Sequence, residues 1–272
     1  MFRTRVISSV VLVILALITI LSGGYILAAT LLFLAIVAYR ELMRACKLGG
    51  DGKHLTVMEL VGCVGIFAYY LVMLFVQERT YLFLSAVLVL MGFMFVYVFS
   101  FPKYHSDQIM NSYFCFAYAP VMLSFIYLVR ALPYGVYTVW MIFISSWICD
   151  TCAYLTGKCI GKHKLAPVLS PKKSIEGAIG GILGSAIVGG LYGYFVVEKV
   201  ISEQKITWVF VLISAIGAVI SQVGDLAASA IKRNQEIKDY GKLIPGHGGV
   251  MDRFDSVIFT APIIYFLTFL LL

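Results

Sequence analysis

Residues 81–99 read YLFLSAVLVLMGFMFVYVF, an apolar run without a single charged side chain. A helix of about 20 residues crosses the roughly 30 Å hydrocarbon core of a bilayer, so this run is long enough to span a membrane. Similar runs recur along the 272 residues, of which 61% are hydrophobic and only 13% charged. The mean hydropathy of +0.95 therefore predicts an integral membrane protein.

Polar breaks between the apolar runs predict about nine transmembrane helices. Their expected ranges are 6–21, 25–39, 57–76, 81–99, 113–129, 134–155, 175–197, 206–231 and 256–272. Backbone hydrogen bonds in the hydrocarbon must be satisfied inside the protein, and the chain lacks the alternating strands of a membrane barrel. We therefore expect an all-α, polytopic helical bundle. The first run ends without a convincing cleavage site, so we expect it to be a span rather than a signal peptide.

Basic residues are divided unevenly between the two predicted sides of the bundle. Of the 21 lysines and arginines, only four fall on the side opposite the N-terminus, namely Arg79, Arg130, Lys199 and Lys205. Cytoplasmic loops are enriched in lysine and arginine, which predicts a cytoplasmic N-terminus and cytoplasmic loops at 156–174 and 232–255. We expect about five transmembrane helices within 1–133 and the region that carries the chemistry within 134–272.

The second of these loops is the most densely polar part of the chain. Together with the end of the preceding helix it reads SAIKRNQEIKDYGKLIPGHGGVMDRFD over residues 229–255. Carboxylates are the hard oxygen ligands that magnesium prefers, and cations can hold phosphate oxygens. A lipid anchor would need only the cations, so the mixture predicts a metal and phosphate site. Its candidate residues are Lys232, Arg233, Lys238, Asp239, His247, Asp252, Arg253 and Asp255.

Glycines flank His247 in the turn PGHGG at 245–249. Backbone amides can approach a ligand closely there, so Gly248 and Gly249 are candidate substrate contacts. A lone histidine is more often an ordinary interfacial residue, but these neighbours favour a role for His247 in the site.

Three acids, Glu59, Asp150 and Asp225, fall inside predicted spans. Lipid penalises a central aspartate by about 2.5 to 3.5 kcal/mol, so such a residue normally faces a partner, water or the protein interior. We expect Glu59, near its helix start, to reach the interface. Asp150 and Asp225 shortly precede the two basic loops, which favours a function for both.

The first loop and its flanks read DTCAYLTGKCIGKHKLAPVLSPKKSIEG over residues 150–177. Ser174 is expected to cap the following helix, and Lys172 and Lys173 stand immediately before it. Free amides at a helix start, joined by two ammonium groups, suit a polyphosphate, and Ser170 is a further candidate contact. A lysine pair at the cytoplasmic surface can equally bind anionic lipids, so the loop alone leaves both interpretations open.

Three further patterns favour structural roles. The glycines of the expected helix 175–197 are spaced for close helix contact, and we expect them to pack inside the monomer. Cys149 and Cys152 form a C-x-x-C, but no second pair accompanies it, so we expect reduced cysteines rather than a zinc site. The run GKCIGKH at 157–163 is one residue short of a P-loop and follows a membrane helix, which excludes that motif.

Taken together, residues 150–255 resemble the phosphatidate cytidylyltransferase (CDP-diacylglycerol synthase) family. The pattern S-x-I-K-R-x4-K-D-x-G-x2-I-P-x-H-G-G-V-x-D-R-F-D at 229–255 is similar to the family's signature, and 150–177 is similar to its second recurring stretch. Membership implies that CTP and phosphatidic acid give CDP-diacylglycerol and pyrophosphate. It also implies Mg²⁺ held by Asp225 and Asp252, a second, monovalent cation such as K⁺, and a homodimer.

On this hypothesis the phosphate of phosphatidic acid attacks the α-phosphorus of CTP in line. The lysines and arginines would neutralise phosphate charge, while Asp150, Asp239, His247 and Asp255 would organise metal, water or the loop. We expect CTP, phosphatidic acid and membrane lipids as partners, and no nucleic acid. The compact chain favours a bacterial inner membrane with the site facing the cytoplasm. The alternatives are a CTP-dependent lipid kinase and a transporter, whose charges should line a midplane pathway.

Overall fold

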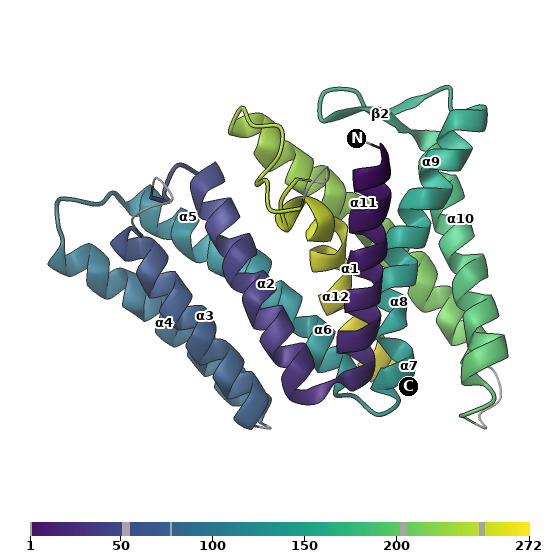
Figure 1. Cartoon of the computed structure of the whole chain (residues 1–272), viewed down its shortest axis with the longest axis horizontal. Coiled ribbons are helices and arrows are strands. Elements are labelled where there is room, and N and C mark those ends of the chain that lie inside the picture. The colour runs from purple at the N-terminus through teal and green to yellow at the C-terminus, as the bar shows by residue number, and fades with distance from the viewer. Residues whose placement is uncertain (1, 51–54, 77, 202–205, 245–247) are drawn as a thin grey trace. The chain divides into compact units, whose positions relative to one another are not determined.

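The structure, a computed structural model, describes residues 2–50, 55–76, 78–201, 206–244 and 248–272. In this part of the chain, eight helical segments are long and apolar enough to cross a membrane (Figure 1). They are α2 (Gly24–Ala45), α3 (Val57–Phe75), α4 (Arg79–Phe99), Ser106–Arg130, Gly135–Ile160, Ile175–Val197, α11 (Ile206–Asn234) and α12 (Met251–Leu271). The predicted all-α, polytopic membrane fold is thereby confirmed.

The expected first span falls on α1 (Phe2–Ser22), whose described apolar stretch is the shorter Val10–Ser22. The count of nine spans and the side of the N-terminus stay predictions. Three of the other spans combine several helical segments. These are α5 (Ser106–Phe116), η1 (Ala117–Val121) and α6 (Met122–Arg130); α7 (Gly135–Thr138), α8 (Trp140–Phe143), η2 (Ile144–Ile148) and α9 (Cys149–Ile160); and α10 (Ile175–Tyr192) with η3 (Gly193–Val197).

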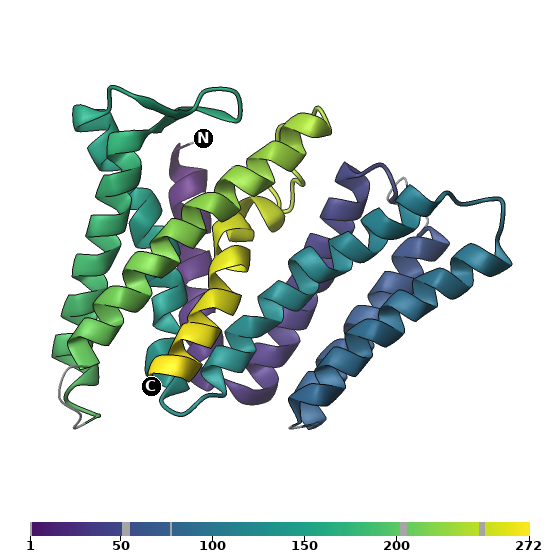
Figure 2. The same ribbon diagram turned by 180° about the vertical axis from the view of Figure 1, so that it is seen from behind.

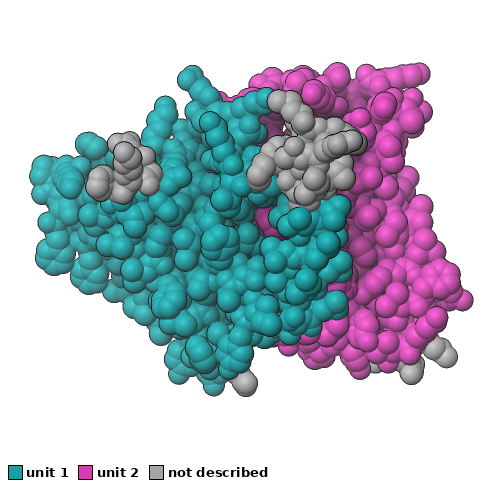
Figure 3. Space-filling view, in the orientation of Figure 1, with its two compact units in different colours: residues 1–127, 235–253 teal, residues 128–234, 254–272 magenta. Residues whose placement is uncertain are grey.

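The chain divides into two compact units, which Figure 3 colours separately. The first unit comprises residues 1–127 and 235–253, and the second comprises 128–234 and 254–272. Both units are therefore discontinuous in sequence. The loop between α11 and α12 belongs with the N-terminal helices, whereas α9, α10 and α11 belong to the second unit.

In the first unit, Glu59 stabilises the start of α3. Its carboxylate accepts the amides of Gly50 and Thr56, completes a capping box with Thr56, and pairs with Arg40 Nε at 3.5 Å. The Glu59 side chain has no exposed surface. Our expectation that Glu59 reaches the interface is therefore wrong, because its helix start and Arg40 satisfy the charge inside the fold.

In the second unit, α9, α10 and α11 lie side by side, as the front and rear views agree (Figures 1 and 2). Glycines of α10 allow this close approach. A Cβ added at Gly184 would lie 2.5 Å from Cys152 Sγ in α9, and one at Gly190 would lie 2.6 Å from Val211 Cγ2 in α11. The predicted internal packing of the glycine-spaced helix is confirmed at these contacts.

The expected loop 156–174 is partly regular structure. Helix α9 continues to Ile160, and β1 (Lys164–Ala166) pairs antiparallel with β2 (Ser170–Ser174). Glu176, in the first turn of α10, accepts the amides of Lys162 and His163 and lies 2.6 Å from His163 Nδ1. These contacts fix the base of the hairpin at the start of α10. The second expected loop is shorter than 232–255, since α11 ends at Asn234 and α12 begins at Met251.

All six cysteines are free thiols. Cys149 of the C-x-x-C is buried and accepts a hydrogen bond from the Gln222 amide at 3.4 Å. Cys152 packs against Gly184. Both side chains thus serve the contacts of α9 with its neighbouring helices.

Candidate functional site

A cavity of about 400 Å³ lies in the second unit, lined by α9, α10, α11 and the hairpin. Its volume falls within the range of small-molecule sites. Six predicted site residues from three separate stretches line it, namely Asp150, Ser170, Lys172, Lys173, Ser174 and Asp225. Lys158, Tyr154 and Gln222 line it too. The fold therefore gathers the polar residues of the first loop with the end of α11.

Ser174 forms the helix cap that the sequence predicts. Its backbone is extended, with φ −119° and ψ 155°, and its Oγ accepts the Gly177 amide at 3.1 Å. A Cβ added at Gly161 would lie 2.6 Å from this hydroxyl, and one at Gly157 would lie 2.9 Å from it. Glycines thus let α9 approach the cap closely, and the start of α10 lies at the cavity with its positive dipole end.

Lys173 and Asp225 form an ion pair at the cavity wall. The ammonium Nζ contacts the carboxylate Oδ2, and the two side chains are only 25% and 26% exposed. The Ser229 hydroxyl lies 3.5 Å from the other oxygen, Oδ1. Lys173, predicted to bind phosphate, and Asp225, predicted to bind metal, are therefore in direct contact.

Asp255 lies within electrostatic range of Asp225, Asp150 and Lys232 in the same unit. Its Oδ1 accepts the Ser256 amide at 2.8 Å. Three acids and two lysines thus contribute to one charged region, four of them from the two signature stretches and Asp225 from the preceding part of α11. The cluster draws on the first turn of α9, on the C-terminal part of α11 and on the N-terminal part of α12.

Magnesium is the ion that the resemblance implies, and the donor chemistry of this region suits it. Among the described residues, no group of three or more His, Cys, Asp or Glu side chains could hold a metal alone. Magnesium usually keeps several waters, however, and is bound by one or two carboxylates plus substrate phosphates. Asp225 offers such an oxygen donor, and the Lys173 ammonium already sits against it. The region suits an ion that arrives with a nucleotide.

In the first unit, Asp252 organises the loop between α11 and α12. Its Oδ2 accepts the amides of Tyr240 at 2.8 Å and Gly249 at 3.0 Å. Gly248 has a φ of +88°, and a Cβ there would lie 2.8 Å from the same oxygen. The predicted residues Gly248, Gly249 and Asp252 therefore lie together, and the Gly249 amide donates a hydrogen bond to Asp252. His247 lies outside the described residues.

Two polar residues of these regions were not predicted as site residues from the sequence. Glu41 of α2 is only 5% exposed and accepts the amides of Val250 and Met251. Gln222 of α11 lines the cavity, and its amide donates to the Ala178 carbonyl at 3.1 Å. Glu41 follows Arg40 at the end of a predicted span, so it resembled a residue of a charged loop. Gln222 carries no charge and offered no signal within an apolar run.

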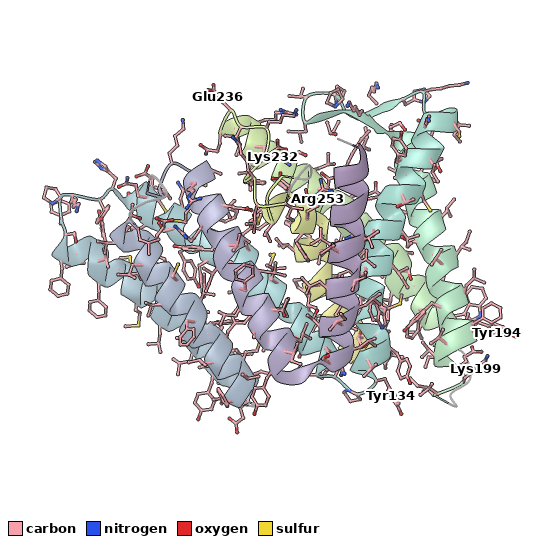
Figure 4. All side chains as sticks on the ribbon, viewed as in Figure 1. Tyr134, Tyr194, Lys199, Lys232, Glu236 and Arg253 are labelled. Atoms are coloured by element: carbon pink, nitrogen blue, oxygen red, sulfur yellow. The ribbon has the colours of Figure 1, made fainter. Side chains whose placement is uncertain are left out.

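The other predicted residues lie on the surface of their units. Arg233, Lys238, Asp239 and Arg253 are exposed, and Lys232 is half-buried. Figure 4 shows Lys232 at one end of the second unit and Lys199 and Tyr194 at the other. Asp225 and Asp252, the two expected metal ligands, belong to different units, so their joint action stays a prediction.

Comparison with known proteins extends over both units. Residues 3–271 match the sequence profile of the Cytidylyltransferase family. The chain is similar to a phosphatidate cytidylyltransferase of Staphylococcus saprophyticus, with 32% identity over 267 residues, 96% of this chain and 97% of the relative. Relatives of the same name from Staphylococcus haemolyticus and Staphylococcus aureus are 31% and 32% identical over the same shares of each chain. The similarity thus includes the N-terminal helices, where the signature stretches do not reach.

Proposed function

The chain belongs to the cytidylyltransferase family, and from that membership we propose how its two site regions serve the reaction. The protein is an integral membrane nucleotidyltransferase that transfers a cytidylyl group from CTP to phosphatidic acid, giving CDP-diacylglycerol. The observation that carries the proposal is the cavity that gathers Lys172, Lys173 and Asp225 at the start of α10.

CTP binds in this cavity, with its phosphates toward the first amides of α10. Lys172 and Lys173 precede this helix start, and Lys158 lines the same cavity. Helix dipole and ammonium groups both favour a polyphosphate there. Lys173 gives up its contact with Asp225 as the phosphates arrive, because the triphosphate carries more negative charge than one carboxylate.

Asp225 and Asp252 would hold Mg²⁺, with a monovalent cation such as K⁺ as a second ion. Bound magnesium would neutralise charge on the transferring and leaving phosphate oxygens. Asp255 lies within electrostatic range of both Asp225 and Asp150, so it adds to the negative potential that attracts a cation. Asp239 and His247 would organise the loop and its water.

The reaction needs no nucleophile from the enzyme. A phosphate oxygen of phosphatidic acid forms a bond to the α-phosphorus of CTP, and the bond from that phosphorus to the bridging oxygen of pyrophosphate breaks. The chain's contribution is to hold both substrates in line and to neutralise the charge that grows on the leaving pyrophosphate. Lys172, Lys173, Lys232, Arg233 and Arg253 are the cations assigned to this role.

The site faces the cytoplasm of a bacterial inner membrane in this proposal. The asymmetry of basic residues supports the orientation, and the similar proteins are bacterial. The enzyme acts as a homodimer, an expectation that the family resemblance carries. Gly184 and Gly190 of α10 already contact α9 and α11, so the dimer interface is sought on other surfaces.

The position of the label in the lipid product tests the activity. Purified protein is incubated with phosphatidic acid, magnesium and CTP labelled on either the α- or the γ-phosphorus. We expect lipid label only from α-labelled CTP and pyrophosphate as the released product. Transfer of γ-label to a lipid with release of CDP would instead identify the lipid kinase. Neither that alternative nor a transporter is supported by the names of the relatives.

A further inference from the structure

The start of α12 is held by a buried carboxylate from a distant part of the chain. Glu41 Oε1 accepts the Val250 amide at 3.1 Å, and Oε2 accepts the Met251 amide at 2.9 Å. Met251 is the first residue of α12 and Val250 immediately precedes it, so neither amide has a carbonyl partner within this helix. Glu41 therefore acts as a helix cap supplied by α2 rather than by the neighbouring sequence.

The loop is shaped to admit this carboxylate. A Cβ at Gly241 or at Gly249 would collide with the Glu41 carboxylate oxygens, so glycine is needed at both positions. Val250 and Met251 are buried as well, with 1% and 0% exposure. A carboxylate in such surroundings is costly unless hydrogen bonds and a favourable dipole compensate, and the start of α12 supplies both.

Glu41 and Asp252 divide three successive amides between them. The Gly249 amide donates to Asp252, and the next two amides donate to Glu41. Asp252 is therefore attached to a backbone segment whose course Glu41 sets. Because Asp252 also accepts the Tyr240 amide, both ends of the loop depend on these two carboxylates.

We propose that Glu41 is a positioning residue that fixes Asp252 for its role with magnesium. The inference rests on the proposed function, which assigns Asp252 to the metal. Glu41 does not touch the ion or the substrates in this account. It acts through the Val250 and Met251 amides, and its loss lets the segment that carries Asp252 relax. Partners that orient a metal ligand typically contribute about 10- to 100-fold in metal affinity.

The first unit offers a matched control for a purely structural role. Glu59 is also a buried carboxylate that accepts two backbone amides, but those amides belong to Gly50 and Thr56 at the start of α3. Glu41→Gln and Glu59→Gln thus make the same chemical change at two buried helix starts. Only the first change touches the loop that carries Asp252.

The test compares these two variants with Glu41→Asp and Asp252→Asn in two measurements. The first is the magnesium concentration that gives half-maximal CDP-diacylglycerol formation. The second is hydrogen exchange of the 249–251 amides in metal-free and substrate-free protein, which needs no activity. For Glu41→Gln we expect an increase of about tenfold or more in the magnesium requirement, together with faster exchange. Glu41→Asp keeps the charge and should show a smaller increase in both.

Glu59→Gln should lower thermal stability while the magnesium requirement and the exchange of 249–251 stay as in the wild type. The proposal is overturned if folded Glu41→Gln keeps the wild-type magnesium requirement while Asp252→Asn needs a much higher magnesium concentration. It is also overturned if Glu59→Gln raises the requirement as much as Glu41→Gln does. A wild-type magnesium requirement in Asp252→Asn would instead overturn the metal assignment of the proposed function, and the inference with it.

Discussion

The Lys173 ammonium contacts the Asp225 carboxylate at the wall of the cavity in the second unit. This pair joins β2, which belongs to the first stretch that resembles the family, to α11, whose last residues begin the second stretch. In this pair the acid and the lysine neutralise each other's charge. Under the proposed function, the pair separates when a nucleotide and a cation offer stronger partners.

Replacing Asp225 tests the acid of this pair. Asp225→Asn keeps the side-chain volume but removes the charge and one anionic oxygen, so we expect magnesium-dependent turnover to fall by at least about a hundredfold. Turnover is measured over a series of magnesium concentrations, with circular dichroism to verify the fold. Asp107→Asn, an exposed acid in the first turn of α5, serves as the control. Wild-type turnover in Asp225→Asn would refute the assignment.

The lysine pair separates a nucleotide site from a lipid anchor. Lys172→Gln and Lys173→Gln should each raise the KM for CTP by about tenfold and change the KM for phosphatidic acid much less, because each loses a charged phosphate contact. Lys199→Gln, at the opposite end of the second unit, should change neither constant. Equal losses for both substrates would favour binding of anionic lipid headgroups by the pair.

The loop glycine Gly248 tests the geometry around Asp252. Gly248→Ala places a methyl group at a φ of +88° and 2.8 Å from Asp252 Oδ2, so the loop must shift. We expect turnover to fall by about tenfold or more, with a fall in melting temperature of only a few degrees, since the strain is local. Steady-state kinetics and thermal unfolding in detergent measure the two effects. A variant with wild-type turnover would show that the loop conformation does not matter for the reaction.

Packing of α10 against α9 is tested by Gly181→Ala. The added Cβ would lie 2.9 Å from the Cys149 carbonyl oxygen and 3.0 Å from Ala153 Cβ, so the helices must separate. Overpacking of this kind costs about 1 to 3 kcal/mol of unfolding free energy. Gly92→Ala in α4 is the matched control, because its nearest contact would be an ordinary 3.5 Å to Val61 Cγ1. Equal thermal stability of the two variants would contradict this account of the packing.

Patterns that depend on neighbouring residues were predictable from the sequence. Apolar runs give the spans, Ser174 stands where a helix cap is expected, and the glycines of α10 have the spacing of close contact. The polar residues Asp150, Lys172, Lys173 and Asp225, which the sequence singled out, line one cavity. Each of these features is encoded by composition, spacing or a recognisable signature.

Features that depend on distant partners were not predictable. Glu41 accepts the amides of Val250 and Met251, which lie more than 200 positions away. The side chains of Val250 and Met251 are apolar, so nothing in their sequence indicates this contact. Glu59 is buried because Arg40 and the amides of the preceding loop reach it, whereas its sequence position alone indicated the interface. The β1–β2 hairpin is held by contacts of Glu176 with Lys162 and His163. The sequence of this segment has no alternating pattern that would predict strands.

Binding of a divalent ion together with CTP tests the central claim most directly. Mn²⁺ replaces Mg²⁺ as a paramagnetic probe, and its binding to the purified protein is followed by electron paramagnetic resonance with and without CTP. The account predicts that CTP strengthens Mn²⁺ binding in the wild type, and that Asp225→Asn loses most of this gain. CTP-dependent Mn²⁺ binding of equal strength in Asp225→Asn would contradict the account.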